Sequence, residues 1–176
     1  MAYSSIVKPT DYFNTVLYTG NGSTNHAITG VGFQPDWSWI KQRSGAEWNI
    51  LIDSVRGVTK YINSNDTGAE RTSSNFIESF DSDGFTLGSA NDTNQSSQTY
   101  ASWNWLGANG TASNSDGSIT STVSANTTAG FSIVSYTGTG SNATVGHGLG
   151  VAPKMIIIKN LNASQGWCVY HESIGA

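Results

Sequence analysis

The sequence is short of charge, and this shortage excludes several kinds of partner. Lys, Arg, Asp and Glu make up 11% of the 176 residues, less than half the share that is usual in a soluble globular protein. The 8 basic residues are scattered along the chain, and the formal net charge is −4. A protein that binds nucleic acid needs a basic patch, and one that binds an anionic membrane surface needs a cluster of cations. We therefore expect neither partner.

Cysteine, long apolar runs and cofactor motifs are also scarce. Cys168 is the single cysteine, so no disulfide can form within the chain, and no Cys and His residues have the spacing of a zinc site. No apolar stretch approaches the roughly 20 residues of a membrane-spanning helix. The first residues lack the cationic start and apolar run of a signal peptide, and no phosphate-binding loop, dinucleotide fingerprint or nucleophile elbow is found. We expect no metal, no cofactor, no membrane insertion, and synthesis in a cytoplasm.

What the sequence does contain is a series of short β-rich runs between turn clusters. Helical periodicity is almost absent, and the runs recur about every ten residues, as in an antiparallel sandwich or barrel. The expected strands cover residues 15–18, 37–43, 48–53, 75–80, 85–87, 99–105, 118–123, 131–136, 154–159 and 167–171. Between two of them, Asp81-Ser82-Asp83-Gly84 places glycine where a tight hairpin needs a positive φ. The pattern predicts an all-β fold.

The chain also repeats itself at an offset of 118 residues, without a gap from residue 15 to residue 41. The matched pairs include Val16 and Val134, Tyr18 and Tyr136, Gly30 and Gly148, Gly32 and Gly150, Pro35 and Pro153, and Lys41 and Lys159. With one inserted residue, Trp48 then matches Trp167, and Gly57 matches Ala176. We interpret the repeat as one supersecondary unit used twice. Its glycines permit unusual φ values, and its proline fixes φ where the chain re-enters a strand.

The repeat gives the expected domain organisation. Residues 1–14 form an N-terminal arm, 15–106 a first β-sandwich unit, 107–117 a linker without large apolar residues, and 118–176 the start of a second unit. The hairpin and the strand that complete the first copy have no counterpart in the second. An incomplete sandwich exposes apolar edges. We expect either that this is the front part of a longer protein or that a neighbouring chain supplies the missing strands.

Two pairs of tryptophans are candidates for ligand binding. Trp37 and Trp39, and likewise Trp103 and Trp105, lie two residues apart, so each pair shares one face of a strand. Exposed indoles could stack on the sugar rings of a glycan, whereas buried indoles would fill the space between two sheets. The second copy favours packing, because methionine and isoleucine replace Trp37 and Trp39 there.

Carboxylates raise two further hypotheses. A glycoside hydrolase needs two carboxylates that flank the scissile bond. The candidates are Glu47, Asp53, Glu70, Glu78 and Glu172. They form no cluster on one strand. Asp53 and Arg56 could form a local ion pair, and a structural turn is the favoured interpretation there. Asp81 and Asp83 begin a calcium-loop spacing, but Thr86 stands where that loop needs glycine, so a turn is favoured. We assign no catalytic residue.

Several longer motifs resemble one family of viral proteins. DYFNTVLYTGNG, GFQPDWSWIKQR, FDSDGFTLG, YASWNWLG and GWCVYHES are found in order along the chain. On these motifs, residues 10–176 resemble the tail-fibre or receptor-binding virion proteins of marine bacteriophages, whose repeated modules are similar to concanavalin A-like lectin sandwiches. The resemblance implies an antiparallel β-sandwich of jelly-roll or concanavalin A-like type, with a partial second repeat. It implies no catalytic residues, and sugar binding is an analogy from the fold.

The resemblance also implies a role and partners. We expect the N-terminal region of a phage tail fibre or similar appendage, located in the virion, attached to other virion proteins through its arm and directed at a host-surface glycan. A homo-oligomer, most simply a trimer, is expected because fibres usually trimerise. The candidate residues are Tyr3, Tyr12 and Phe13 for attachment, and Trp37, Trp39, Trp103 and Trp105 for the glycan. The alternatives are a capsid or tail decoration protein without a receptor and, third, a glycan-degrading enzyme.

Overall fold

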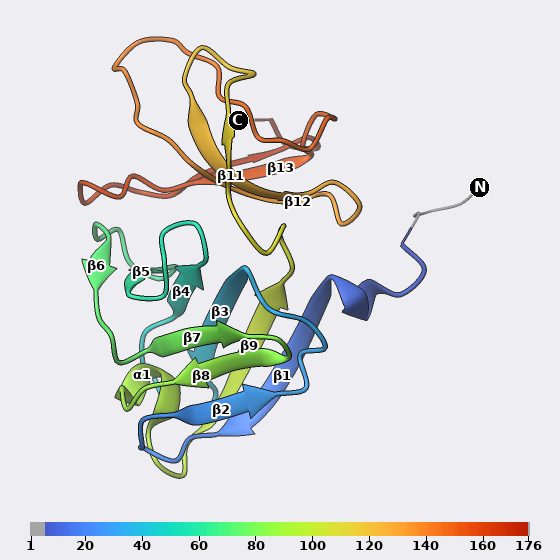
Figure 1. Ribbon diagram of the computed structural model, residues 1–176. Coiled ribbons are helices and arrows are strands. Elements are labelled where there is room, and N and C mark those ends of the chain that lie inside the picture. The colour runs from blue at the N-terminus through green and yellow to red at the C-terminus, as the bar shows by residue number, and fades with distance from the viewer. Residues whose placement is uncertain (1–5, 176) are drawn as a thin grey trace.

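The computed structural model describes residues 6–175 and consists almost entirely of antiparallel strands (Figure 1). The predicted all-β fold of antiparallel sheets is confirmed. Among these residues the helical elements are η1 (Pro9–Asp11) and α1 (Asn91–Asn94), and neither has the length and apolarity needed to cross a bilayer. Tyr3, one of the predicted attachment residues, lies outside the described part of the chain.

The first unit is a sandwich of two sheets. A six-stranded sheet has the order β1-β9-β3-β4-β5-β6. Its strands are β1 (Phe13–Thr19), β9 (Thr99–Trp105), β3 (Trp37–Gln42), β4 (Ile50–Asp53), β5 (Lys60–Asn63) and β6 (Arg71–Thr72). A three-stranded sheet has the order β2-β8-β7, with strands β2 (His26–Thr29), β8 (Gly84–Leu87) and β7 (Ile77–Asp81). Figure 1 shows this smaller sheet lying across one face of the larger one.

The core lies between these two sheets and follows from the alternation of side chains along each strand. In β3, for example, Ser38, Ile40 and Gln42 are buried, whereas the residues between them are only partly buried. Both sheets contribute to the core cluster, which consists of Ile28, Ile40, Ile50, Ile52, Phe76, Ile77, Phe85, Leu87 and Tyr100. Removing this much apolar surface from water is the main stabilising contribution to the first unit.

The second unit has two separate sheets. Strands β10 (Ala112–Asn114), β11 (Ser121–Asn126) and β12 (Phe131–Ser135) form one sheet, and β13 (Met155–Ile158) pairs with β14 (Cys168–His171) in the other. Figure 1 shows this unit packed at one end of the first unit.

The strand register supports the repeat and corrects one detail of its alignment. In the first unit Trp37 pairs with Asp53, and in the second Met155 pairs with His171, so both strands of the hairpin keep the offset of 118 residues. The predicted one-residue shift is therefore confined to the loop, where Trp48 matches Trp167. It does not continue into the strand, contrary to the prediction, because Ser54 corresponds to Glu172 there. The counterpart of Gly57 is Gly175, with φ values of 92° and 79°.

One side-chain contact joins the same two positions in both copies, although the residues at these positions differ. In the first copy the Ser54 hydroxyl donates to the Asp36 carboxylate at 2.6 Å. At the same two positions of the second copy, Lys154 Nζ lies 2.5 Å from Glu172 Oε2. The backbone N–H groups of Ser54 and Glu172 also donate to the carbonyls of Asp36 and Lys154, at 2.8 and 2.9 Å. The two hairpins thus share one geometry.

Residues 107–117, predicted as a linker, are ordered by hydrogen bonds to both units. The buried carboxylate of Asp36 accepts the N–H groups of Gly107 at 2.8 Å and Asn109 at 3.0 Å. From the second unit, Ser124 Oγ accepts the Ala108 N–H at 2.9 Å, and Asn126 Nδ2 donates to the Gly107 carbonyl at 3.2 Å. The same segment also contains β10, which pairs with β11.

Four strands were not predicted: β2, β5, β6 and β10. Each has four residues or fewer, and none shows a clear alternation of apolar and polar side chains. Strands this short are fixed by neighbours distant in sequence, as in β2, whose residues pair with Gly84–Leu87 of β8.

A bend made by two glycines precedes the strand in each copy. Gly30 and Gly32 have φ values of 89° and 88°, and Gly148 and Gly150 have 75° and 72°. In the first copy the carboxylate of Asp83, from the turn between β7 and β8, accepts the N–H groups of Gly30 at 3.0 Å and Gly32 at 2.6 Å. These hydrogen bonds lower the pKa of Asp83, with the Gly32 bond the largest cause.

We predict that Asp83→Asn lowers the melting temperature at neutral pH and that this difference shrinks in acid. A lowered pKa in the folded state means that the carboxylate contributes stability above its unfolded pKa of about 3.9, and that this is lost as pH falls through the folded pKa. Thermal melts of both proteins across this range measure the effect. Asp11→Asn, on an exposed ion pair with Lys8, serves as the control. A difference that does not change with pH would contradict the prediction.

Candidate functional site

The four candidate tryptophans lie together on the outer face of the six-stranded sheet, which we define as the face that points away from the three-stranded sheet. Trp37 pairs with Trp105, and Trp39 pairs with Trp103, on the adjacent strands β3 and β9. The residues between them in sequence face the core. The structure therefore brings the four residues together, and the interpretation that they fill the space between the two sheets is wrong.

The indoles form a continuous layer on this face. The rings of Trp37 and Trp105 are stacked with centroids 4.6 Å apart, and those of Trp39 and Trp103 are tilted at 5.8 Å. Phe13, on the edge strand β1, extends the layer with its ring 4.7 Å from Trp105. We call these five residues the aromatic stripe. Aromatic pairs at such distances stabilise one another by about 0.5–1.5 kcal/mol beyond the area that they bury.

The second unit covers one end of the aromatic stripe. Phe131, the first residue of β12, stacks on Trp37 at 5.8 Å and on Trp105 at 6.1 Å. Beside it lies a shallow pocket of about 260 Å³, whose lining includes Tyr12, Phe13, Trp105 and Phe131. The predicted attachment residues Tyr12 and Phe13 thus lie next to part of the predicted glycan site.

The sequence analysis did not identify Phe131 as a site residue, although the repeat could have indicated it. It stands 118 residues after Phe13, so the repeat extends two positions beyond the matched segment. The two phenylalanines lie on either side of Trp105, one from each copy. Asp36, which binds the segment after β9, was also missed, because its counterpart in the second copy is lysine and the match gave no signal there.

Trp39 has a feature that the other three tryptophans lack. Its indole Nε1 is buried and has no hydrogen-bond partner among the described residues. A buried donor without an acceptor costs about 1–3 kcal/mol. Trp39 lies on the half of the aromatic stripe that is away from Phe131, next to Trp103 and opposite Leu51 of β4.

We predict that Trp39→Phe changes the unfolding free energy by about 1 kcal/mol or less, because removing an unsatisfied donor offsets the lost packing. Trp37→Phe is the matched control, since it loses contacts with two stacked rings and relieves no such donor. Denaturant unfolding of both variants measures the difference. A larger loss for Trp39→Phe than for Trp37→Phe would show that the indole N–H has an acceptor.

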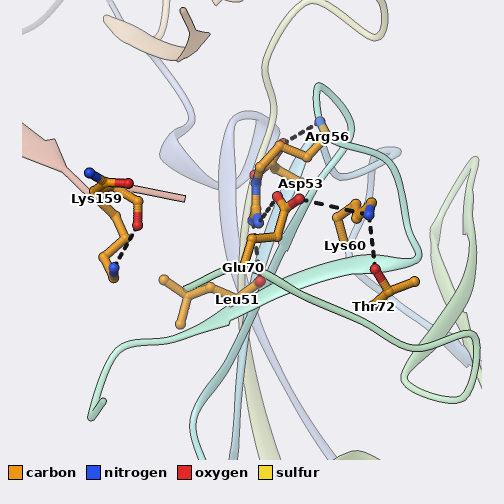
Figure 2. Close-up of polar contacts among 8 residues, drawn as sticks. Leu51, Asp53, Arg56, Lys60, Glu70, Thr72 and Lys159 are labelled. Carbon is orange, nitrogen blue, oxygen red and sulfur yellow. Dashed lines mark hydrogen bonds and ion pairs between the residues drawn. The ribbon is translucent and has the colours of Figure 1, made fainter. Parts of the chain in front are cut away.

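A cluster of charged side chains lies beside the aromatic stripe and includes Asp53, the last residue of β4. Figure 2 shows the side chains of this cluster. Asp53 lies directly opposite Trp37, and its Oδ2 is 2.5 Å from Arg56 Nε. Arg56 also reaches Glu70, with Nη1 3.2 Å from Oε2, and Lys60 lies 3.9 Å from the other Glu70 oxygen. The side chains of Arg56 and Asp53 are 9% and 7% exposed, so this pair is buried. The ion pair that the sequence allowed for Asp53 and Arg56 is formed, and residues 54–56 are the turn that was favoured there.

Four of the five candidate catalytic carboxylates are held in structural contacts. Asp53 and Glu70 share the guanidinium of Arg56. Glu78 accepts the Asn25 N–H at 3.1 Å, and Glu172 pairs with Lys154 in the second unit. A carboxylate bound by a cation is a poor general acid. Over residues 6–175 no group of three or more His, Cys, Asp or Glu side chains is placed to bind a metal ion.

The loop that continues from this cluster also contacts the second unit. The Glu70 N–H donates to the Leu161 carbonyl at 2.9 Å, and Trp167 Nε1 donates to the Asp66 carbonyl at 3.0 Å. Asp66 itself pairs with Arg71, whose hydrogen bond is the main cause of its lowered pKa. The second unit therefore meets the first at both sides of its outer face, at Phe131 and at this loop.

These observations define a class of protein: an all-β protein with two repeat-related units, the second docked on an aromatic outer face of the first. The chain belongs to the family described as "Domain of unknown function (DUF7483)", whose model matches residues 8–176. No curated protein and no solved structure matches the chain. The family carries no assigned activity, so the function has to be argued from the geometry.

Proposed function

We propose that the protein is a structural component of a bacteriophage virion, the N-terminal region of a tail fibre or similar appendage. The observation that carries the proposal is the docking of two repeat units in series through an ordered junction. A fibre has to hold successive modules at a fixed spacing. The resemblance of residues 10–176 to phage appendage proteins supports the same role.

The junction suits a mechanical role because three kinds of contact act together. Phe131 stacks on the aromatic stripe, Trp167 and Leu161 bond to the loop before β6, and the Asp36 carboxylate holds the connecting segment. Interfaces within a chain allow relative motion unless they are extensive. Here the connecting segment is itself bonded to both units, which limits that motion.

Within this role we further propose that the modules are lectin-like and contact a host-surface glycan, without enzymatic activity. Trp39 and Trp103 are the part of the aromatic stripe that Phe131 does not stack on. A sugar presents C–H groups that pack on such rings. The virion partners would be bound near Tyr12 and Phe13, and the oligomer would be a homotrimer.

The alternative of a decoration protein without a receptor is favoured by one observation. Phe131 already covers Trp37 and Trp105, so half of the candidate glycan site is occupied by the chain itself. In that case the aromatic stripe serves only to dock the second unit.

Two measurements test the proposal. Peptides of this protein should be found by mass spectrometry in purified phage particles, and their absence would overturn the virion role. The isolated protein should then compete with phage for adsorption to host cells, and Trp103→Ala should compete less well. Failure to compete at high protein concentration would favour the decoration role. Release of reducing ends from host polysaccharide, abolished by Glu47→Gln or Glu78→Gln, would show an enzyme instead.

A further inference from the structure

Two Asn-Gly pairs occur in the sequence, Asn21-Gly22 and Asn109-Gly110. Asparagine before glycine is chemically labile, because the backbone nitrogen of the glycine can attack the side-chain amide carbon and no Cβ hinders its approach. A Cβ placed on Gly110 would meet no atom within 4 Å outside its chain neighbours, so this pair also lies in open space. The two pairs share their chemistry and differ in how the fold holds them.

The fold protects the first pair through one buried side chain and its backbone. The Gly22 N–H donates to the Asn94 carbonyl at 2.7 Å. The side-chain oxygen of Asn21 accepts the Ser23 N–H at 2.8 Å and Asn94 Nδ2 at 3.1 Å. Asn94 is fully buried. Both the nitrogen that would attack and the amide that would be attacked are therefore fixed by hydrogen bonds.

The second pair leaves its glycine nitrogen free. For the Gly110 N–H no acceptor is found among the described residues. Asn109 is exposed and lies in the segment that connects the two units. The Gly110 nitrogen can therefore approach the Asn109 side chain without first breaking a hydrogen bond, whereas the Gly22 nitrogen cannot approach Asn21 in this way.

The Asn109 amide lies against a buried carboxylate. In the orientation that its neighbours require, its Nδ2 donates to Asp36 Oδ2 at 3.2 Å and to the Gln34 carbonyl at 3.1 Å. The Asn109 backbone N–H donates to the same Asp36 oxygen at 3.0 Å. A carboxylate in place of this amide would lose the donor and bring a second negative charge beside Asp36. Like charges this close disfavour one another.

We propose that Asn109 is a deamidation site and that its product loosens the junction between the two units. The Gly110 nitrogen forms a bond to the side-chain carbon of Asn109 and gives up its proton, and the side-chain nitrogen leaves as ammonia. Water then opens the cyclic succinimide at one C–N bond to give aspartate, or at the other to give isoaspartate. Either product adds one negative charge here. The site does not depend on the proposed virion role.

The new charge acts where the connecting segment is bound. Asp36 holds this segment through the N–H groups of Gly107 and Asn109. Repulsion between the two carboxylates moves residue 109 away from Asp36, and its backbone hydrogen bond is lost with the side-chain one. The rate of deamidation then sets how long the junction keeps its hydrogen bonds.

The first test incubates the full 176-residue chain at neutral pH and measures deamidation at each asparagine by fragment-ion mass spectrometry. We expect Asn109 to react about fivefold faster than Asn21 or more, the factor that one ordinary hydrogen bond adds to a barrier. In denaturant the two sites should react at similar rates, because the fold no longer holds either. Equal rates in the folded chain would overturn the proposal, as would a difference that persists in denaturant.

Gly110→Ala tests the chemistry without adding charge. The alanine Cβ enters open space, and Gly110 does not adopt the positive φ that disfavours alanine. Deamidation of Asn109 should therefore slow, because the Cβ hinders the attacking nitrogen, while the amides of Gly107 and Asn109 keep their protection from hydrogen exchange. Unchanged deamidation in this variant would show that the Gly110 nitrogen is not the nucleophile.

Asn109→Asp reproduces the aspartate product and tests its effect on the junction. Residue 109 has a φ of 51°, which aspartate adopts as asparagine does. The amides of residues 107 and 109 should exchange faster than in the unaltered chain. Asn142→Asp is the matched control, since it adds the same charge at an exposed position in the loop between β12 and β13. Equal exchange at residues 107 and 109 in the two variants would overturn the effect on the junction.

Discussion

Replacing Arg56 with methionine should lower the free energy of unfolding by about 3–5 kcal/mol, the cost usual for removing one partner of a buried ion pair. The guanidinium touches Asp53 at 2.5 Å and Glu70 at 3.2 Å, and donates to the Leu51 carbonyl at 3.3 Å (Figure 2). Glu70 would keep Lys60, but Asp53 would be left as a buried carboxylate without a cation. Denaturant unfolding, followed by tryptophan fluorescence, measures the loss.

The double variant Asp53→Asn with Arg56→Met separates the charge from the packing. It removes the unpaired carboxylate while keeping the shape of the side chain, so we expect it to recover much of the loss. Lys8→Met, which removes one partner of an exposed ion pair with Asp11, should change stability by no more than about 1 kcal/mol. If Arg56→Met behaves like Lys8→Met, the cluster beside the aromatic stripe contributes little to the fold.

Alternation in the sequence identified which residues share a face but not which face lies inside. Trp37 and Trp39 were rightly placed together, as were Trp103 and Trp105. The six-stranded sheet is covered on both faces, on one side by the smaller sheet and on part of the other by the second unit. Both faces of β3 therefore carry apolar side chains, and only the tertiary structure shows that the tryptophans lie outside the core.

The repeat predicted relations between strands that the strand propensities could not show. It related β1, β3 and β4 to β12, β13 and β14, and the shared register of the two hairpins agrees with that relation. It could not give β2, β5 or β6, which are short strands fixed by distant partners.

The contacts that hold the predicted linker could not be seen in its composition. Residues 107–117 have the composition of a flexible connector, yet their backbone is bound by side chains far away in the sequence. A hydrogen bond from a distant carboxylate to a backbone N–H leaves no signal in local composition. Asp36 is fully buried, and its partners become apparent only when the end of β9 is brought beside the start of β3.

Replacing Asp36 with alanine should therefore loosen the junction of the two units and lower the free energy of unfolding by about 3 kcal/mol. The change leaves the N–H groups of Gly107 and Asn109 and the Ser54 hydroxyl without their acceptor, and an unsatisfied buried polar group costs about 1–3 kcal/mol. Ser54→Ala is the matched control, since it removes one hydrogen bond of the same carboxylate and leaves both linker amides bonded. It should cost about 1 kcal/mol.

Hydrogen exchange distinguishes loosening of the junction from a general loss of stability. In Asp36→Ala, the amides of Gly107 and Asn109 should exchange much faster, while those of β7 and β8, on the far sheet, should keep their protection under native conditions. Small-angle scattering should show a broader range of distances between the units. Equal exchange in Asp36→Ala and Ser54→Ala would mean that Phe131 and Trp167 hold the units together without the carboxylate. The fixed spacing on which the fibre role depends would then rest on the aromatic contacts alone.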